Sequence, residues 1–208
     1  MTEKYGTITL IPKEGARELK YELTPFRTES DYQDIRHPEE IFWSDDLLLD
    51  VQRRDFRMNA IYYACRLLKL PSASEVKMLS LDAILKVLDK EGFVYFADQQ
   101  VLIVQKASLI TQLLPKGKID SDFLYYLLDM QLMSYVTQEQ EDSIDTPAQN
   151  IPLHILIDPA LGIQSLIKKK LETVGEPDQR FGEDALRLLR ALRFVNVLNH
   201  KLLTKCEI

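Results

Sequence analysis

The segment from Glu183 to Phe194 constrains the fold more than any other part of the chain. It contains no glycine, proline or β-branched residue and is rich in leucine, alanine and arginine, so it is predicted to be one helix. Glu183 and Asp184 would lie in its first turn, where the helix dipole favours carboxylates. Apolar residues recur along the segment, which predicts one buried stripe made of Leu186, Leu189, Leu192, Val195 and Leu198.

The charged residues of this segment form a second row at intervals of three, made of Asp184, Arg187, Arg190 and Arg193. One explanation is an ordinary surface helix with ion pairs from Glu183 and Asp184 to Arg187. The other is a surface that holds a planar or anionic ligand, since arginine suits bidentate contacts with such groups. The segment alone leaves both explanations open.

Composition narrows the class of protein. The 208 residues fit one domain or two small ones, and no run of about 18 apolar residues predicts a membrane span. No signal peptide is recognisable, and Cys65 and Cys206 lack metal-site spacing, so we expect a cytoplasmic protein. The net charge of −6 argues against a uniformly basic nucleic-acid-binding surface but allows a local basic groove.

The first part of the chain predicts a β-hairpin followed by a polar loop. Residues 5–11 and 19–24 read as two strands, and Glu22 lies on the opposite face from Tyr21 and Leu23. Residues 26–38 are charged yet contain aromatic residues, which favours an ordered functional loop. Ser44 is expected to cap a short helix.

A polar cluster, Arg53-Arg54-Asp55, precedes the apolar residues that begin at Phe56. The simplest interpretation is an arginine–aspartate ion pair at a helix end. With its neighbours, however, the segment Arg53-Arg54-Asp55-Phe56-x-x-Asn59-Ala60 resembles the second motif of the class II tRNA nucleotidyltransferase and bacterial poly(A) polymerase family. Further segments resemble the same family in the same order, namely Gly6–Thr9, Glu22–Glu29, Ile157-Asp158-Pro159-x-x-Gly162 and the neck-helix motif from Arg180 to Phe194.

The resemblance implies roles for individual residues. It assigns Arg53, Arg54 and Asp55 to the ribose and phosphates of an incoming nucleotide, with Asn59 in support. It assigns Asp184 and Arg187 to the base. An aspartate that accepts from an amino group and an arginine that donates to the adjacent ring nitrogen select cytosine and adenine over uracil and guanine.

The resemblance also gives Arg190 and Arg193 a supporting charge, and it makes Glu22 the candidate third acid of the catalytic site. It implies ATP and CTP as substrates together with a tRNA or other RNA 3′ end. The expected reaction is attack of the RNA 3′-hydroxyl on the α-phosphate, assisted by Mg²⁺ ions that acidic residues hold.

One part of the family pattern is missing. The glycine loop and Asp-x-Asp metal pair that precede Gly6 in the family are absent, and Asp120-Ser121-Asp122 reads as a helix N-terminus instead. We therefore expect a fragment that binds nucleotide and RNA but is not competent alone. The alternative is a non-catalytic relative acting with a partner chain that supplies the metal-binding strand.

The predicted fold class is α+β with three parts. Residues 1–63 and 154–175 would form a partial nucleotidyltransferase head sheet, and residues 176–208 the start of a helical neck. Residues 64–153 would be an inserted α/β module, because in the family Tyr63 runs almost directly into the strand at Ile157. In this module we expect helices at 80–91, 107–114 and 121–136, and a hairpin of 93–96 with 101–104.

Overall fold

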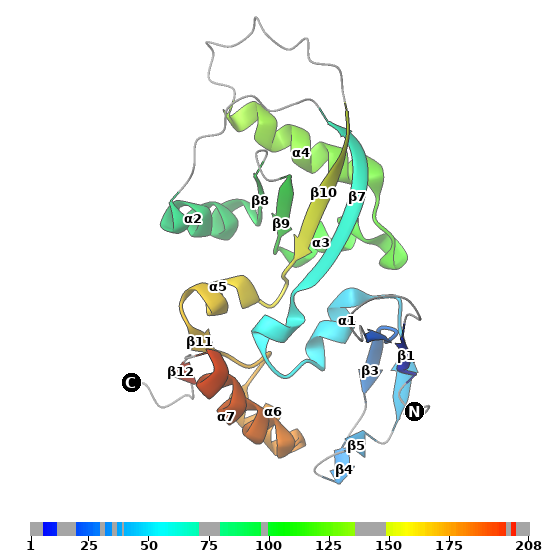
Figure 1. Cartoon of the computed structure of the whole chain (residues 1–208), viewed down its shortest axis with the longest axis vertical. Helices are drawn as coiled ribbons and strands as arrows, with labels where there is room; N and C mark the ends of the chain where they lie inside the picture. Colours follow the sequence, from blue (N-terminus) through cyan, green and yellow to red (C-terminus); the bar gives the residue numbers. More distant parts are fainter. Residues whose placement is uncertain are drawn as a thin grey trace, which may run out of the picture.

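The computed structural model describes residues 6–11, 20–29, 32–34, 37–38, 40–70, 80–96, 100–135, 149–198 and 201–202. The described residues contain both helices and strands, and most of the strand pairs are antiparallel, which confirms the α+β class. The two longest described strands, β7 (Tyr62–Leu70) and β10 (Gln149–Ile157), belong to an upper sheet, and their lower ends reach a group of smaller elements (Figure 1).

The upper part is a four-stranded sheet of order β7-β10-β9-β8 with helices packed on it. β10 pairs antiparallel with β7 along its whole length and parallel with β9, whose other neighbour is β8. The elements are β7 (Tyr62–Leu70), α2 (Leu81–Glu91), β8 (Phe93–Phe96), β9 (Val101–Val104), α3 (Ala107–Leu113), η3 (Pro115–Gly117), α4 (Ser121–Tyr135) and β10 (Gln149–Ile157).

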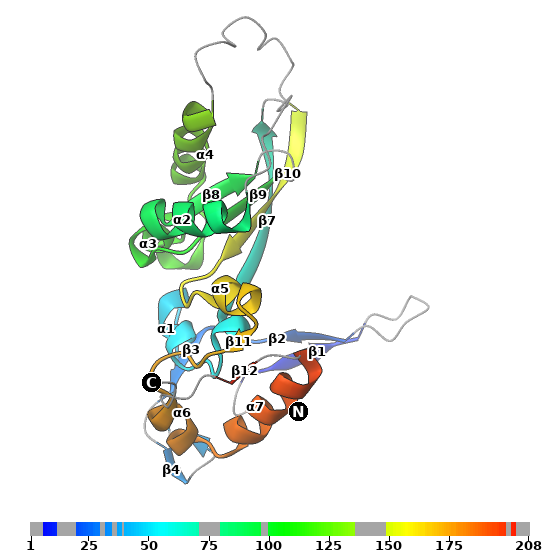
Figure 2. The ribbon, with the colours of Figure 1, turned by 90° about the vertical axis from the view of Figure 1, so that its left-hand side faces the viewer.

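The two faces of this sheet are covered differently. One face packs on α3 and α4 through a core that includes Leu102, Leu124 and Leu153, each with 0% exposure. On the other face, α2 covers β8 and β9 through Leu88, while β7 leaves its side chains exposed. Figure 2 shows α3 and α4 on one side, with β7 and β10 on the other.

The lower part consists of short two-stranded sheets and helices around the start of β7. β1 pairs with β2, β3 with β6, β4 with β5 and β11 with β12. The elements are β1 (Ile8–Leu10), β2 (Tyr21–Leu23), β3 (Arg27–Glu29), β4 (Tyr32–Asp34), β5 (His37–Pro38), β6 (Ile41–Trp43), α1 (Leu47–Gln52), η2 (Arg57–Ala60), α5 (Gly162–Ile167), β11 (Lys170–Leu171), α6 (Pro177–Glu183), α7 (Leu186–Leu198) and β12 (Lys201–Leu202).

Most expected elements are present. The β1–β2 hairpin forms with Glu22 opposite Thr9, and the α2 helix has Ser80 as its N-cap and Gly92 as its C-cap. Asp120 accepts a hydrogen bond from the Phe123 amide at 2.8 Å, so the helix-start interpretation of residues 120–122 is confirmed. The cap of α1 differs from the expectation, because Asp46 and not Ser44 accepts from the amide of the first turn.

The expected continuous helix from Glu183 to Phe194 is wrong. α6 ends at Glu183, Asp184 adopts an extended backbone, and α7 begins at Leu186. The Asp184 carboxylate accepts a hydrogen bond from the Leu186 amide at 2.8 Å, so this side chain starts a new helix as an N-cap does. Helix propensity favours helix throughout the segment, but the aspartate offers the backbone an alternative partner.

The expected buried stripe of α7 is also wrong. Leu186, Leu189, Leu192 and Leu198 are 41%, 62%, 52% and 37% exposed, whereas Arg187 and Ala191 are buried. Residues three apart fall about 60° short of a full turn, so a row with only this spacing winds around the helix. The face that packs on the rest of the protein is set instead by Arg187, Ala191 and the half-buried Phe194.

Helix α5 approaches η2 closely, and this contact supplies a test of the packing. A Cβ at Gly162 would lie 2.3 Å from the carbonyl oxygen of Arg57, which is backbone and cannot move aside easily. We expect Gly162→Ala to lower the free energy of unfolding by about 1–3 kcal/mol, as overpacking does, in urea titrations.

Gly182 provides the matched control. A Cβ there would meet no atom within 4 Å, and the residue lies in α6. Gly182→Ala should leave stability unchanged or raise it by up to about 1 kcal/mol, because alanine has the higher helix propensity. Equal effects of the two substitutions would show that the α5–η2 contact is not tight.

Candidate functional site

The carboxylate of Asp50, in α1, organises the arginines of the Arg53-Arg54-Asp55 cluster. Its Oδ1 accepts from Arg53 Nε at 2.8 Å and NH2 at 2.5 Å, and its Oδ2 accepts from Arg54 Nε at 3.0 Å and NH2 at 2.6 Å. Each guanidinium therefore meets one carboxylate oxygen with two of its donors. The Asp50 side chain has no exposed surface, so this pairing is shielded from water.

Two further groups complete the Asp50 environment. The Tyr62 hydroxyl donates to Oδ2 at 2.8 Å, and the Arg27 amide donates to Oδ1 at 3.3 Å. Burial opposes ionisation of Asp50, but the hydrogen bonds from Arg54 and Tyr62 and the charges of both arginines outweigh it, so the pKa of Asp50 is lowered. Burial raises the pKa of Tyr62, which therefore remains a hydroxyl donor.

Asp55 points away from the two arginines that precede it. Its Oδ1 accepts from the Phe56 amide at 2.8 Å and from Asn59 Nδ2 at 3.0 Å, which ties Asp55 to η2. Its Oδ2 lies 2.8 Å from Arg190 Nε. That contact is an ion pair by distance but is not directed as a hydrogen bond, because Oδ2 has no donor in hydrogen-bond geometry among the described residues.

The Asp55–Arg190 pair joins two segments far apart in the sequence. Asp55 is 8% exposed, whereas the Arg190 side chain is 56% exposed and reaches the carboxylate from α7. Beside the pair, Phe56 packs edge-on against Phe194 with ring centroids 5.7 Å apart. A small core of Phe56, Leu171 and Ala191 thus fixes α7 beside the polar cluster.

A second connection runs through α6. Arg180 donates to the carbonyl oxygens of Val174, at 2.6 Å, and of Gln52 at the end of α1. The same guanidinium binds Glu183 at 2.9 Å, and Arg187 NH1 binds Glu183 at 2.5 Å and the Arg180 carbonyl at 3.0 Å. Burial opposes ionisation of Glu183, but the Arg187 hydrogen bond and the Arg180 charge outweigh it and lower its pKa.

The proposed base-reading pair lies at the start of α7. Arg187 is 6% exposed and is held by Glu183, so the ion pair expected of an ordinary surface helix does form, but on the buried face. Asp184 is half-buried, and one of its oxygens caps α7. Arg193 lies on the exposed face.

Glu22 lies on β2 and is exposed. Within the described residues, no group of three or more histidine, cysteine, aspartate or glutamate side chains is placed to hold a metal ion. The donor set around Glu22 does not fit the expected Mg²⁺ ions, and we derive no step through them. The described helices include none long and apolar enough to cross a membrane.

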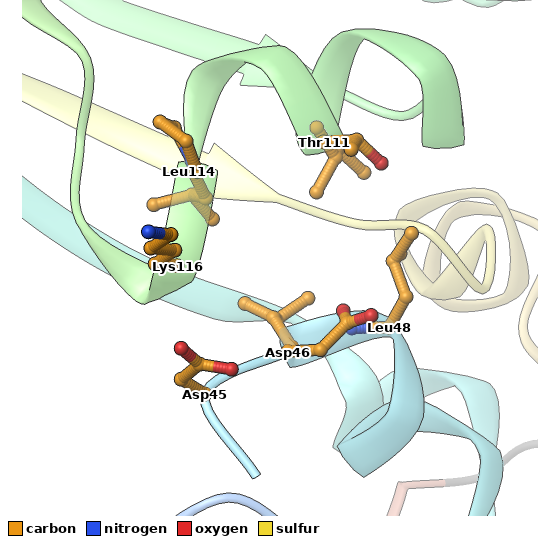
Figure 3. A pocket seen from close by; sticks show the side chains of 9 residues that line it. Asp45, Asp46, Leu48, Thr111, Leu114 and Lys116 are labelled. Carbon is orange, nitrogen blue, oxygen red and sulfur yellow. The ribbon is translucent and has the colours of Figure 1, made fainter.

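A shallow pocket of about 200 Å³ lies elsewhere, between the start of α1 and the α3–η3 region (Figure 3). None of the expected nucleotide-binding residues lines it. Asp45 and Asp46 face Lys116 and Thr111 across it. Because the expected nucleotide-binding residues gather around Asp50 and Asp55, we place the candidate site at those clusters and not at the pocket.

Comparison with known proteins agrees with the motifs. Residues 1–76 match the model of the poly A polymerase head domain. The CCA-adding enzyme of Anoxybacillus flavithermus is 26% identical over 203 residues, which is 98% of this chain and 28% of that enzyme. The CCA-adding enzyme of Staphylococcus saprophyticus is 28% identical over 191 residues, 92% of this chain and 25% of that enzyme.

These matches support the resemblance of the chain to the class II tRNA nucleotidyltransferase and bacterial poly(A) polymerase family. The chain spans about a quarter of the length of these curated relatives. In the structure, the Arg53-Arg54-Asp55 cluster and α7 are in direct contact through Asp55 and Arg190.

Sequence reasoning missed two residues that build this arrangement. Asp50 precedes Arg53 and Arg54 by three and four residues, the spacing of side-chain pairs on one helix, and this signal was available. Arg180 was recognised only as part of a motif. Its contact with the Gln52 carbonyl joins residues 128 positions apart, and no local pattern predicts such a contact.

The lowered pKa of Glu183 predicts a pH-dependent stability. Its pKa in the folded protein is below the ordinary value of 4.5, so the unfolded chain binds the proton more readily in this range. The contribution of Glu183 to the free energy of unfolding is therefore full above about pH 4.5 and is lost as the pH falls through the folded pKa. We expect Glu183→Gln to lose less stability than wild type between about pH 6 and about pH 3.

Urea titrations at each pH measure this difference. Glu91→Gln is the control, because Glu91 is an exposed carboxylate in α2 whose ion pair with Lys90 is on the surface, where such pairs contribute little. It should lose stability on acidification as wild type does. If Glu183→Gln lost as much as wild type, the Arg180–Glu183–Arg187 network would not stabilise the fold.

Proposed function

We propose that the chain carries the nucleotide-selecting part of an RNA 3′-end nucleotidyltransferase, with ATP and CTP as its nucleotides and a tRNA or other RNA 3′ end as the acceptor. The observation that supports it best is the Asp55–Arg190 ion pair at 2.8 Å. It brings the family's phosphate-and-ribose motif against the helix that carries the proposed base-reading residues. The relatives described above are CCA-adding enzymes, which agrees with this reaction.

The charges of the site suit a nucleoside triphosphate. Two guanidinium groups share one carboxylate, Asp50, and Arg53 NH1 also lies 3.8 Å from Glu29, which pairs with Arg27. These three arginines and two carboxylates together keep a net positive charge. Arg53 and Arg54 bind Asp50 side-on through Nε and NH2, which turns the other edge of each planar group away from Asp50. Phosphate oxygens are the ligands that such guanidinium edges prefer.

Base selection is assigned to Asp184 and Arg187. Cytosine and adenine each place an amino group beside an unprotonated ring nitrogen, so one acceptor and one donor recognise both. Uracil and guanine present a carbonyl beside an N–H group, which reverses the pattern. Because Glu183 fixes Arg187 and the helix cap fixes Asp184, the pair is ordered before a nucleotide binds, and less entropy is lost on binding.

The test is equilibrium binding of the four nucleoside triphosphates, measured by calorimetry. We expect wild type to bind ATP and CTP more tightly than GTP and UTP. Asp184→Asn should reduce ATP and CTP affinity about 10-fold to 100-fold, as loss of a bidentate base contact does. Asparagine is also a good helix cap, so this variant should keep the start of α7 intact.

Arg187→Ala should weaken the binding of ATP and CTP in the same way. Arg66→Ala is its control and should leave the binding unchanged, since Arg66 is exposed on β7. Circular dichroism of each variant separates loss of binding from loss of folding. Unchanged ATP and CTP affinity in well-folded Asp184→Asn and Arg187→Ala would exclude the base-reading role.

A further inference from the structure

We infer that Asp50 is a positioning residue of the nucleotide site, which fixes the direction of the Arg53 and Arg54 guanidinium groups toward the triphosphate. This inference rests on the proposed function. It adds a residue that lies outside the Arg53-Arg54-Asp55 cluster and that the motif resemblance does not assign. Asp50 would not touch the nucleotide, because both of its oxygens are buried and occupied.

The two ion pairs with Asp50 fix the orientation of the Arg53 and Arg54 guanidinium groups. Each arginine uses Nε and NH2 on a single oxygen of Asp50, so two contacts define the orientation of each guanidinium plane. A long arginine side chain on a surface helix has many rotamers, and ordering it on a ligand costs entropy. Asp50 removes that freedom before the ligand arrives.

The two arginine side chains are more exposed than the carboxylate that they bind. The Arg53 and Arg54 side chains are 15% and 33% exposed, whereas Asp50 is at 0%. The arginines therefore lie between the buried carboxylate and solvent. An anion that approaches from solvent would meet the more exposed Arg54 guanidinium, and the part of Arg53 that Glu29, 3.8 Å from its NH1, leaves accessible.

Neighbouring groups from β3 and β7 hold the Asp50 carboxylate in place. Tyr62 is the first residue of β7. Its hydroxyl donates to Asp50 Oδ2, and its ring centroid lies 5.5 Å from Arg54 Cζ. The same ring packs edge-on against Phe26. The Arg27 amide of β3 holds Oδ1, so Asp50 is fixed from three elements, α1, β3 and β7.

A purely structural ion-pair cluster is the competing explanation. It predicts that changes at Asp50 lower stability without regard to the ligand. A positioning role predicts a loss that depends on the phosphates, because within the cluster we assign the phosphates to Arg53 and Arg54 and the ribose to Asp55. Comparing ATP with adenosine, which lacks phosphates, distinguishes the two explanations.

The experiment measures the binding of ATP and of adenosine to the full chain at fixed ionic strength by calorimetry. Asp50→Asn should weaken ATP binding about 10-fold to 100-fold, the size of effect that misplacing a binding group produces, with adenosine affinity unchanged. Asp45→Asn is the matched control, because it removes the same charge from an exposed residue near the start of α1. It should change neither affinity.

A double-mutant cycle tests whether Asp50 acts through the arginines. In an Arg53→Ala, Arg54→Ala background, Asp50→Asn should cause no further loss of ATP affinity, because its only route to the phosphates is gone. An equal loss of ATP affinity in both backgrounds, or a parallel loss of adenosine and ATP affinity in folded protein, would overturn the inference.

Tyr62→Phe keeps the test decisive if Asp50→Asn does not fold. It removes one hydrogen bond to Asp50 and retains both ion pairs, so ATP binding should weaken about 3-fold to 10-fold, with adenosine affinity unchanged. ATP affinity equal to wild type would overturn the inference. Failure of wild type to bind ATP would instead reject the proposed function, so the two failures are distinguishable.

Discussion

A single buried carboxylate, Asp50, determines how the candidate site is arranged. A buried charge is costly unless it is fully paired, and Asp50 is paired with two guanidinium groups, a hydroxyl and a backbone amide. The cost of leaving it unpaired constrains α1, β3 and β7 at once. The position of the two arginines is therefore coupled to the packing of three elements and does not depend on α1 alone.

Helix α7 is fixed to this centre by two different kinds of contact. Phe56, Leu171 and Ala191 form an apolar core, and the ion pair of Asp55 with Arg190 lies at its edge. Arg180 adds a polar connection from α6 to the end of α1. Apolar packing holds α7 close, while the polar contacts of Arg190 and Arg180 connect α7 and α6 to the segment of Gln52 and Asp55, so residues that the sequence separates by more than 120 positions share one site.

The sequence predicted the local elements and the residue classes of the site, because strand alternation, caps and motif spacing are local signals. The β1–β2 hairpin, the helix α2 and the β8–β9 hairpin were all predicted this way. The orientation of α7 was not, because residues three apart wind around a helix and only tertiary packing selects the buried face. The long-range contacts of Arg180 and Arg190 could not be predicted either, since the residues near them in the sequence do not indicate which groups they contact.

Hydrogen bonds link the β8–β9 strands to the segments that build the candidate site. β10 ends at Ile157, and Asp158 follows it fully buried, accepting from the Gly162 and Ile163 amides at the start of α5. Gln105, at the end of β9, donates to the same carboxylate at 2.8 Å. Burial raises the pKa of Asp158 despite these donors, so the carboxylate is held against a desolvation cost. Since α5 packs on η2, which Asn59 ties to Asp55, displacement of the β8–β9 layer would be transmitted toward the candidate site through packed backbone.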